Sequence, residues 1–419
     1  MRKLAIALAI AAVTLHAQAP VSLGVRGRIN ANVSLAASGE FVAAVWSSAD
    51  AEDNEDIDAA FSRDGGVTFA PAVRVNSTPG SARTSGEQPP RLALIPRSSG
   101  PGIVVVWTAK GTAGTRLMSA KSDDSGRTFT GEAIVPGSDA AGNRGWESVA
   151  ADAGGHVHVL WLDHRDAAAT AMDMSHHMDH NMPVPAQADA VARAQLSKIY
   201  AASLDDPRSG HPLAAGVCYC CKTAMAVGAD GSLDAAWRHV YPGNIRDIAF
   251  ARSTDGGRTF SQPVRVSEDK WAIDGCPENG PAMAVGADRV VHLAWPTLVG
   301  ASGNAQGTLG LFYAATKDGR QFSPRQAIPT SGVPRHVQLL AGKSGLALAW
   351  DEAAAGPRQI ALARGAVRAD GHVDFTRQVL KELGDASYAS LAQTPDSLVI
   401  AAQSGGDANT VIRLVRVKS

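Results

Sequence analysis

The chain has few aromatic residues, almost no net charge and only four cysteines among its 419 residues. A formal net charge of −1 provides neither the basic surface that nucleic-acid binding needs nor a strong field toward an anionic membrane. Beyond the N-terminal segment, no apolar run approaches the length of a membrane-spanning helix. Low-complexity segments are also missing, whereas glycine is abundant, with 42 residues. These features together indicate a globular all-β protein without a membrane span.

The first 19 residues have the composition of a secretory signal peptide. Arg2 and Lys3 provide a positive start, residues 4–15 form an apolar segment, and Ala17-Gln18-Ala19 supplies a small-x-small cleavage site. We therefore expect residues 1–19 to be removed, and the mature protein, residues 20–419, to be periplasmic or secreted.

One short pattern, Ser-x-Asp-x-Gly-x-Thr-Phe, recurs four times and organises the rest of the chain. Its aspartates are Asp64, Asp124, Asp255 and Asp318, and the fourth copy is one residue shorter. The Asp and Ser side chains can bond nearby backbone groups in a tight turn, and glycine adopts the positive φ that such a turn needs. The Phe begins the next strand. The pattern therefore predicts four similar turns between strands.

This pattern closely resembles the Asp box of the sialidase superfamily, whose members are β-propellers. The resemblance implies blades of four strands, with the box in the turn between the third and fourth strands. In that family the box is a structural device and carries no catalysis. The active site of the family lies on the opposite face of the propeller.

A second repeat accompanies the boxes: a strand, a tight turn and a second strand that usually ends in tryptophan. A seventh copy, Ala389 to Gln403, lacks the tryptophan. Since four strands make one blade, we predict a single β-propeller with seven blades, and six, the number in sialidases, as the alternative. The last blade has three strands of its own, so we expect Val21–Arg26 to pair with Thr410–Val417 and close the ring. The other six copies end at Trp46, Trp107, Trp161, Trp237, Trp295 and Trp350.

Blade three contains an insertion at about residues 167–195, on the face opposite the boxes. Seven of the eleven residues from 172 to 182 are Met or His. Thioether sulfur suits Cu(I) and imidazole suits copper or zinc, so we predict a metal-binding loop, copper first and zinc as the alternative. A solvated loop of accidental composition is the competing interpretation, and a salt-bridged rim explains Asp163–Asp166 at its root. The proposed ligands are Met172, Met174, His176, His177, Met178, His180 and Met182.

The four cysteines precede the inner strands of blades four and five. Aligning the repeats places Cys218 opposite Cys276, so we expect Cys276 to lie close to the triplet Cys218, Cys220 and Cys221. Exported proteins normally form disulfides, and one bridge from Cys276 into the triplet fits that rule. Pairing the two remaining cysteines strains the bridge geometry. Structural disulfides, thiolate metal ligands and redox chemistry therefore all remain open.

The sialidase resemblance also implies a catalytic set. Members of the family hold the substrate carboxylate with three arginines and use a tyrosine nucleophile activated by a glutamate, with an aspartate as acid/base. The segment Ser387–Leu391 looks like the family's nucleophile segment and makes Tyr388 the candidate, although a tyrosine that opens an inner strand also fits simple packing. The family's early Arg-Ile-Pro motif appears here only as Arg28-Ile29-Asn30. The remaining candidates are Arg28, Arg238 and Arg335 for the carboxylate, Glu352 or Glu147 as the activator, and Asp50, Asp53 or Asp56 as the acid.

We therefore expect an exported propeller that binds a soft transition metal, copper first, through the cysteine cluster and the Met/His loop. The enzyme hypothesis is an exo-sialidase-like glycoside hydrolase acting on acidic sugars. A third hypothesis is a glycan- or protein-binding propeller whose disulfides are structural. The expected partner is another exported metalloprotein or a glycan, and we expect a monomer.

Overall fold

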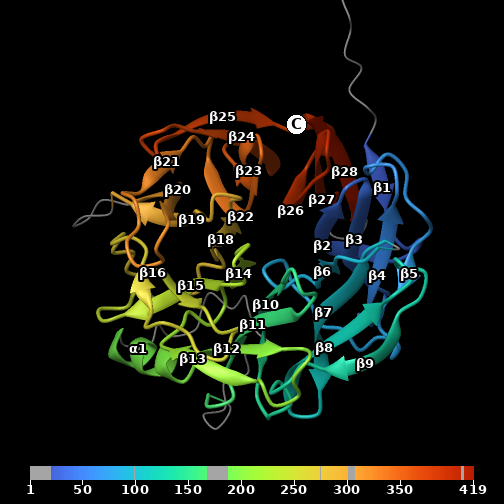
Figure 1. Cartoon of the computed structure of the whole chain (residues 1–419), viewed down its shortest axis with the longest axis horizontal. Coiled ribbons are helices and arrows are strands. Elements are labelled where there is room, and N and C mark those ends of the chain that lie inside the picture. Colours follow the sequence, from blue (N-terminus) through green and yellow to red (C-terminus); the bar gives the residue numbers. More distant parts are fainter. Residues whose placement is uncertain (1–19, 99, 168–186, 274, 301–306, 407–409) are drawn as a thin grey trace, which may run out of the picture.

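The computed structural model describes residues 20–98, 100–167, 187–273, 275–300, 307–406 and 410–419. The strands form seven four-stranded antiparallel sheets, arranged as blades around a central axis (Figure 1). The prediction of an all-β, seven-bladed propeller is therefore confirmed, and the six-bladed alternative is wrong. Within the described ranges, no helix is long and apolar enough to cross a membrane.

Each blade runs from an inner strand at the axis to an outer strand at the rim. Blades 1 to 3 contain β2 (Ile29–Ser38), β3 (Phe41–Ala49), β4 (Glu55–Ser62), β5 (Val73–Arg74); β6 (Arg91–Ile95), β7 (Gly102–Gly111), β8 (Gly114–Ser122), β9 (Thr130–Ile134); β10 (Arg144–Ala151), β11 (Val157–Asp163), β12 (Lys198–Ser203) and β13 (His211–Ala215). Blades 4 and 5 contain β14 (Ala224–Val227), β15 (Leu233–Tyr241), β16 (Ile245–Ser253), β17 (Val264–Arg265); β18 (Ala282–Val285), β19 (Val291–Val299), β20 (Thr308–Thr316) and β21 (Gln326–Ile328). Blades 6 and 7 contain β22 (Val333–Gly342), β23 (Gly345–Ala353), β24 (Gln359–Val367), β25 (Val373–Val379); β26 (Ala386–Gln393), β27 (Ser397–Ser404), β28 (Val411–Lys418) and β1 (Val21–Leu23). The described residues also form the helix α1 (Gln187–Gln195) and the 3₁₀ turn η2 (Lys381–Leu383).

The ring is closed by the N-terminal strand, as predicted. β1 pairs antiparallel with β28, so that Val21 lies opposite Leu414 and Leu23 opposite Ile412. Leu23 is buried in the hydrophobic cluster between blades 7 and 1. β1 therefore covers β28 and leaves an outer edge of only three residues, and such a short edge offers little room for edge-to-edge aggregation.

The core consists of seven hydrophobic clusters, one between each pair of neighbouring blades. Because each blade packs against a neighbour on both faces, the second strands are buried almost throughout, as in β3 and β7. Burial of apolar area on both faces is the main stabilising contribution of such a sheet. The tryptophans that mark the repeat lie in these strands and are completely buried: Trp46, Trp107, Trp161, Trp237, Trp295 and Trp350.

The four box patterns form the turns between the third and fourth strands of blades 1, 2, 4 and 5. Asp255 accepts the backbone N–H of Thr259 at 3.0 Å and its hydroxyl at 2.6 Å, while the Ser253 hydroxyl accepts the N–H of Gly257 at 2.9 Å. The aspartates of the other boxes accept backbone N–H groups in the same way. Because the strands alternate in direction, these turns lie on the face opposite the connections between blades. The face that carries the connections between blades is called the site face below.

Candidate functional site

Four inner strands contain a β-bulge near their start, at the site face. In each bulge one residue other than glycine has a left-handed backbone, with φ between 53° and 58°. Such a conformation costs about 1–3 kcal/mol per residue and is found preferentially at functional sites. The ring of bulges therefore marks the axial end of the site face, through Asn32, Trp146, His336 and Tyr388.

Tyr388 and His336 belong to neighbouring blades and stack on each other, with ring centroids 4.1 Å apart. His336 Nδ1 lies 2.6 Å from Asp351 Oδ1, and Arg358 Nη1 donates to Asp351 Oδ2 at 2.7 Å. Asp351 also accepts the backbone N–H of Tyr388, at 3.2 Å. These four residues are called the Tyr388 cluster. Asp351 is completely buried and fixes the imidazole, whereas Tyr388 is half-buried.

The loop before β6 lies directly against this cluster. A Cβ on Gly86 would lie 1.9 Å from Tyr388 Cζ, so only glycine leaves room for the ring. The neighbouring Glu87 is buried, and its Oε2 accepts the backbone N–H groups of Lys222 and Gly280, both at 3.0 Å. Among the described residues, Glu87 Oε1 has no hydrogen-bond partner. The Glu87 carboxylate, which precedes blade 2, thus forms hydrogen bonds to the segments before blades 4 and 5 through one oxygen, while its other oxygen accepts no hydrogen bond from the described residues.

The ionisable groups in and near the Tyr388 cluster have pKa values that are shifted in different directions. Burial raises the pKa of Tyr388 to about 12, with further contributions from the charges of Glu87 and Asp351, so the phenol is neutral at neutral pH. Burial alone would raise the pKa of Asp351, but the hydrogen bond and charge of His336 and the charge of Arg358 lower it overall. Burial lowers the pKa of Lys222 to about 8, and its Nζ donates to the Val337 carbonyl at 2.6 Å.

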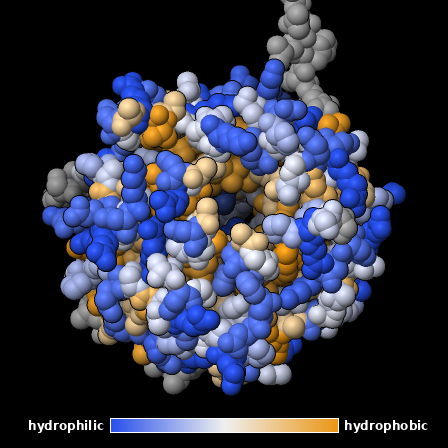
Figure 2. Space-filling model, in the orientation of Figure 1, coloured by the Kyte–Doolittle hydropathy of each residue, from blue (hydrophilic) through white to orange (hydrophobic). Residues whose placement is uncertain are grey.

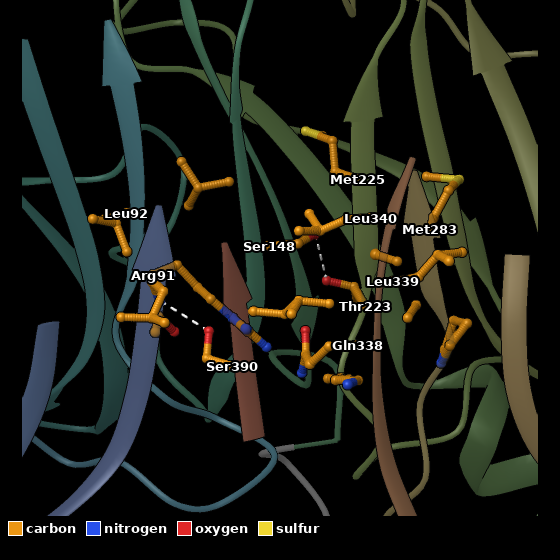
Figure 3. A pocket seen from close by; sticks show the side chains of 18 residues that line it. Arg91, Leu92, Ser148, Thr223, Met225, Met283, Gln338, Leu339, Leu340 and Ser390 are labelled. Carbon is orange, nitrogen blue, oxygen red and sulfur yellow. Dashed lines mark hydrogen bonds between the residues drawn. The ribbon is translucent and has the colours of Figure 1, made fainter. Parts of the chain in front are cut away.

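Further along the axis lies a cavity of about 170 Å³, lined by the inner strands of all seven blades. The space-filling view shows the hollow at the centre of the ring (Figure 2). Arg91 extends its guanidinium into the middle of this cavity, beside Ser390 and the hydrogen-bonded pair of Ser148 and Thr223 (Figure 3). Such a volume holds about five or six water molecules. A larger ligand therefore has room only at the mouth.

Glu147, predicted as an activating carboxylate, is buried at the bulge of blade 3. Its Oε2 lies 3.2 Å from the Thr108 hydroxyl, and Oε1 has no partner among the described residues. Burial raises the pKa of Glu147 to about 7. The neighbouring Arg91 donates to the Glu147 backbone carbonyl rather than to its carboxylate.

The predicted acids and Arg28 lie together in blade 1. Arg28 Nη1 donates to Asp56 at 2.5 Å, and its Nη2 lies 3.6 Å from Asp50. Asp50 in turn caps its own turn by accepting the backbone N–H of Asn54. Asp53 sits in that exposed turn with a positive φ of 60°. Arg28 is thus already neutralised by neighbouring carboxylates.

The other two arginines lie in different surroundings. Arg238 is completely buried, stacks over Trp271, and donates to the backbone carbonyls of Asn279, Arg246 and Pro296. Arg335 is half-buried and directly precedes His336 of the Tyr388 cluster. Arg28 and Arg238 are thus held by carboxylates and carbonyls of the protein itself, and Arg335 is the one of the three next to the Tyr388 cluster in the chain.

Glu352, the other predicted activating carboxylate, forms its contacts within its own blade. Its Oε2 accepts the Trp350 indole N–H at 2.8 Å and the backbone N–H of Ser331, and its Oε1 pairs with Arg377. Asp163 has the same relation to Trp161, whose indole donates to it at 3.0 Å. Each of these acids lies two residues after a tryptophan, accepts its indole N–H and so stabilises the end of a second strand.

The cysteines gather at the site face, and the expected bridge from Cys276 into the triplet is present. Cys220 and Cys276 form a disulfide, whereas Cys218 and Cys221 are buried thiols. The sulfurs of Cys218, Cys220 and Cys221 lie within 4.8 Å of one another. Burial alone would raise the pKa of Cys218, but its hydrogen bond with Cys221 and the charges of Arg246 and Arg238 lower it to about 6. Burial and Cys218 raise the pKa of Cys221.

The predicted Met/His ligands, residues 172–182, lie outside the described residues. The end of the insertion is described and forms the helix α1, which the sequence pattern did not indicate. Its Ala194 packs into the cluster between blades 3 and 4. At the root of the insertion, Asp163 binds Arg144 and Arg165, which matches the salt-bridged rim.

Sequence reasoning missed most of the Tyr388 cluster, namely His336, Asp351 and Arg358, and also Gly86 and Glu87. One signal was available: His336 and Tyr388 occupy equivalent positions, each in the bulge directly after the first paired residues of its inner strand. Gly86 and Glu87 lie in the loop before β6, the inner strand of blade 2. Comparing these positions across blades points to the same ring of residues.

Neither the protein-family models nor the curated proteins contain a match to this chain. Solved structures do match its fold. A protein of unknown function from Dyadobacter fermentans has 12% sequence identity and a TM-score of 0.53, covering 96% of this chain and 99% of its own. The GH93 α-L-arabinofuranosidase of Fusarium graminearum, solved with arabinobiose, has 12% identity and a TM-score of 0.53, covering 96% and 97%. A PL25 ulvan lyase has 9% identity and a TM-score of 0.55, covering 95% and 96%. At these identities the similarity shows the propeller fold alone.

Proposed function

We propose that this protein binds an acidic glycan at the mouth of the propeller axis and cleaves a glycosidic linkage there, with Tyr388 as the reacting group. The observation that carries the proposal is the Tyr388 cluster: a half-buried phenol stacked on an imidazole that a buried carboxylate fixes. Two of its members, Tyr388 and His336, have left-handed backbones. Strain of this kind persists where the surrounding structure enforces it for function.

The chemistry follows from the protonation states. A neutral phenol donates a proton as it stands, and it becomes a nucleophile when a base removes that proton. Glu87 is the candidate base, because its Oε1 has no partner among the described residues and its charge acts on the Tyr388 phenol. When His336 donates from Nδ1 to Asp351, its Nε2 remains for a second proton transfer. The cluster therefore offers a tyrosine, a carboxylate and an imidazole for acid–base work.

Two cations near the site supply counter-charges for an anionic sugar, beside the carboxylates of Glu87, Asp351 and Glu278 that act on the same phenol. Arg358 lies close enough to Tyr388 for its charge to act on the phenol, and the buried Lys222 contributes a second cation at the axis. Two of the structural matches act on glycans by their descriptions, one as an arabinofuranosidase and one as an ulvan lyase bound to a unit of glucuronic acid and sulfated rhamnose. These matches support a glycan as the ligand class.

Hydrolysis through a tyrosine nucleophile, as the sialidase resemblance implies, is the main route. The fixed His336 favours a second route, β-elimination, in which phenol and imidazole move protons at a uronic acid. The two routes leave different products. Hydrolysis gives a saturated sugar, and elimination gives an unsaturated one that absorbs ultraviolet light.

A panel of an aryl sialoside, an aryl arabinofuranoside and a uronate polymer tests the proposal, with aglycone release, reducing ends and ultraviolet absorbance as readouts. Tyr388→Phe keeps the stacked ring and should lower cleavage by about 100-fold or more. Tyr241→Phe is the matched control, because Tyr241 also contacts a histidine, His239, at 4.6 Å. Binding of glycans without cleavage of any of them would leave a lectin-like propeller instead.

Soft-metal binding is the second candidate, and three clustered sulfurs support it. The Cys220–Cys276 bridge removes one of them from coordination, so copper, or zinc as the alternative, ranks behind glycan cleavage. Metal content of protein purified without chelators tests this candidate. Bound copper that survives dialysis in wild type and is lost in Cys218→Ser would favour it.

A further inference from the structure

The four cysteines are arranged as a buried dithiol in contact with a disulfide. Cys218 Sγ lies 3.9 Å from Cys220 Sγ and 3.7 Å from Cys221 Sγ. Cys218, Cys220 and Cys221 are each only 1% exposed, whereas Cys276 is exposed. The disulfide therefore has an inner sulfur next to free thiols and an outer sulfur at the surface.

Arg246 places its positive charge beside one of the two thiols. It is completely buried, and its Nη1 lies 3.1 Å from Cys218 Sγ. Within the described part of the chain, Arg246 forms no ion pair with a carboxylate. A buried guanidinium needs a nearby counter-charge, and a thiolate at Cys218 supplies it. The thiolate is also the species that attacks a disulfide sulfur.

We propose that these cysteines form a thiol–disulfide exchange site, in which the Cys218 thiolate attacks Cys220 and releases Cys276 at the surface. The Cys218–Cys220 bond forms as the Cys220–Cys276 bond breaks, and the electron pair leaves on Cys276. Cys221, deprotonated in this step, then attacks Cys218 and releases Cys220. The net change oxidises Cys218 and Cys221 to a disulfide and reduces the other pair to one thiol and one thiolate, with the single proton coming from Cys221.

The exposed Cys276 gives this exchange an external substrate, a small-molecule or protein disulfide. The Cys276 thiolate attacks that disulfide and forms a mixed disulfide, releasing one external thiol. Cys220 then attacks Cys276, restores the Cys220–Cys276 bond and releases the second external thiol. Overall, two electrons from Cys218 and Cys221 reduce one external disulfide, with one proton from Cys221 and one from solvent. The site is distinct from the glycan site in chemistry, although Lys222 directly follows Cys221.

Alkylation of the native, full-length protein with a maleimide, followed by mass-spectrometric mapping, tests the exchange. Cys276 reacts with maleimide only after Cys218 has displaced it. We expect labelling of Cys276 in wild type to be more than about tenfold faster than in Cys218→Ser. In Cys221→Ser the second step is blocked, so Cys276 should be labelled while a Cys218–Cys220 disulfide accumulates. Circular dichroism checks that both variants are folded.

Two results would overturn the proposal. One is equal labelling of Cys276 in wild type and Cys218→Ser, which would mean that Cys218 does not act on the disulfide. The other is a pair of findings. Wild type would bind added Cu(I) tightly through Cys218 and Cys221 while its Cys220–Cys276 bond stays intact, and Cys276 would remain unlabelled in Cys221→Ser. That second result would assign the cluster to a metal. Glycan cleavage is measured separately, so its failure leaves this test unaffected.

Discussion

Substituting Gly86 by alanine should displace the Tyr388 ring and leave the rest of the propeller in place. The new Cβ would lie 1.9 Å from Tyr388 Cζ and 2.5 Å from its hydroxyl oxygen, whereas ordinary contacts begin at 3.4 Å. The ring must therefore move by about 1.5 Å, the difference between 3.4 and 1.9 Å. Gly86 does not have a left-handed backbone, so alanine adds no strain of its own.

A displacement of about 1 Å at a reacting group can lower the rate about 100-fold. Gly86→Ala should therefore approach the loss of cleavage seen in Tyr388→Phe, with little change in melting temperature. Gly131→Ala is the control, because nothing lies within 4 Å of its Cβ position. A second readout does not need a substrate. As the ring leaves its buried position, the pKa of Tyr388 should fall from about 12 toward 10, in an ultraviolet titration with Tyr388→Phe as the blank.

Wild-type cleavage and an unchanged tyrosine titration in Gly86→Ala would refute this reasoning. That outcome would mean that the loop before β6 yields instead of the ring. A large fall in melting temperature would also contradict it, because the clash would then be transmitted into the blades.

Three further changes test other parts of the structure. Glu147→Gln should raise the free energy of unfolding by up to about 3 kcal/mol above pH 7 and hardly change it below pH 4.5. The reason is that the raised pKa of Glu147 makes the wild-type protein lose stability as the pH rises between those values. Urea unfolding at a series of pH values measures the difference. Asp64→Ala should lower the melting temperature at pH 7, and the difference should shrink as the pH falls from 3.8 toward 2, since hydrogen bonds to Thr68 and Ser62 lower the pKa of Asp64 to about 2. Leu23→Ala should cost about 2 kcal/mol by denaturant unfolding, while Ser22→Ala, on the exposed side of β1, should change little; equal effects would contradict the role of β1 in the core.

The architecture was predictable because each blade repeats the same local requirements. The box turns need Asp, Ser and Gly at fixed positions, and the second strands need apolar residues on both faces, with a fully buried Trp in six of the seven blades. Both requirements can be read from the residues themselves. The closure by residues 21–23 followed from counting strands in the last blade.

The site was harder to predict because it combines bulges within inner strands, loops before them and the end of a second strand. The loops differ in length, so alignment of the repeats placed Cys276 opposite Cys218, whereas its bridge is to Cys220. Tyr388 was identified by resemblance, but its partner His336 comes from the preceding blade. The roles of Glu352 and Asp163 beside tryptophan indoles depend on distances between side chains, which spacing in the chain does not give.

The closure of the ring also sets an order of folding events. A ribosome makes the N-terminal strand first, yet the partner of β1 is the last strand of the chain, more than 380 residues later. Domains generally begin to fold from the N-terminal side during synthesis. Blades 1 to 6 can therefore stack while β1 waits unpaired, and the interface between blades 7 and 1 forms only when residues 411–418 arrive. A protease that removes a few residues at either terminus would reopen the ring at this one joint.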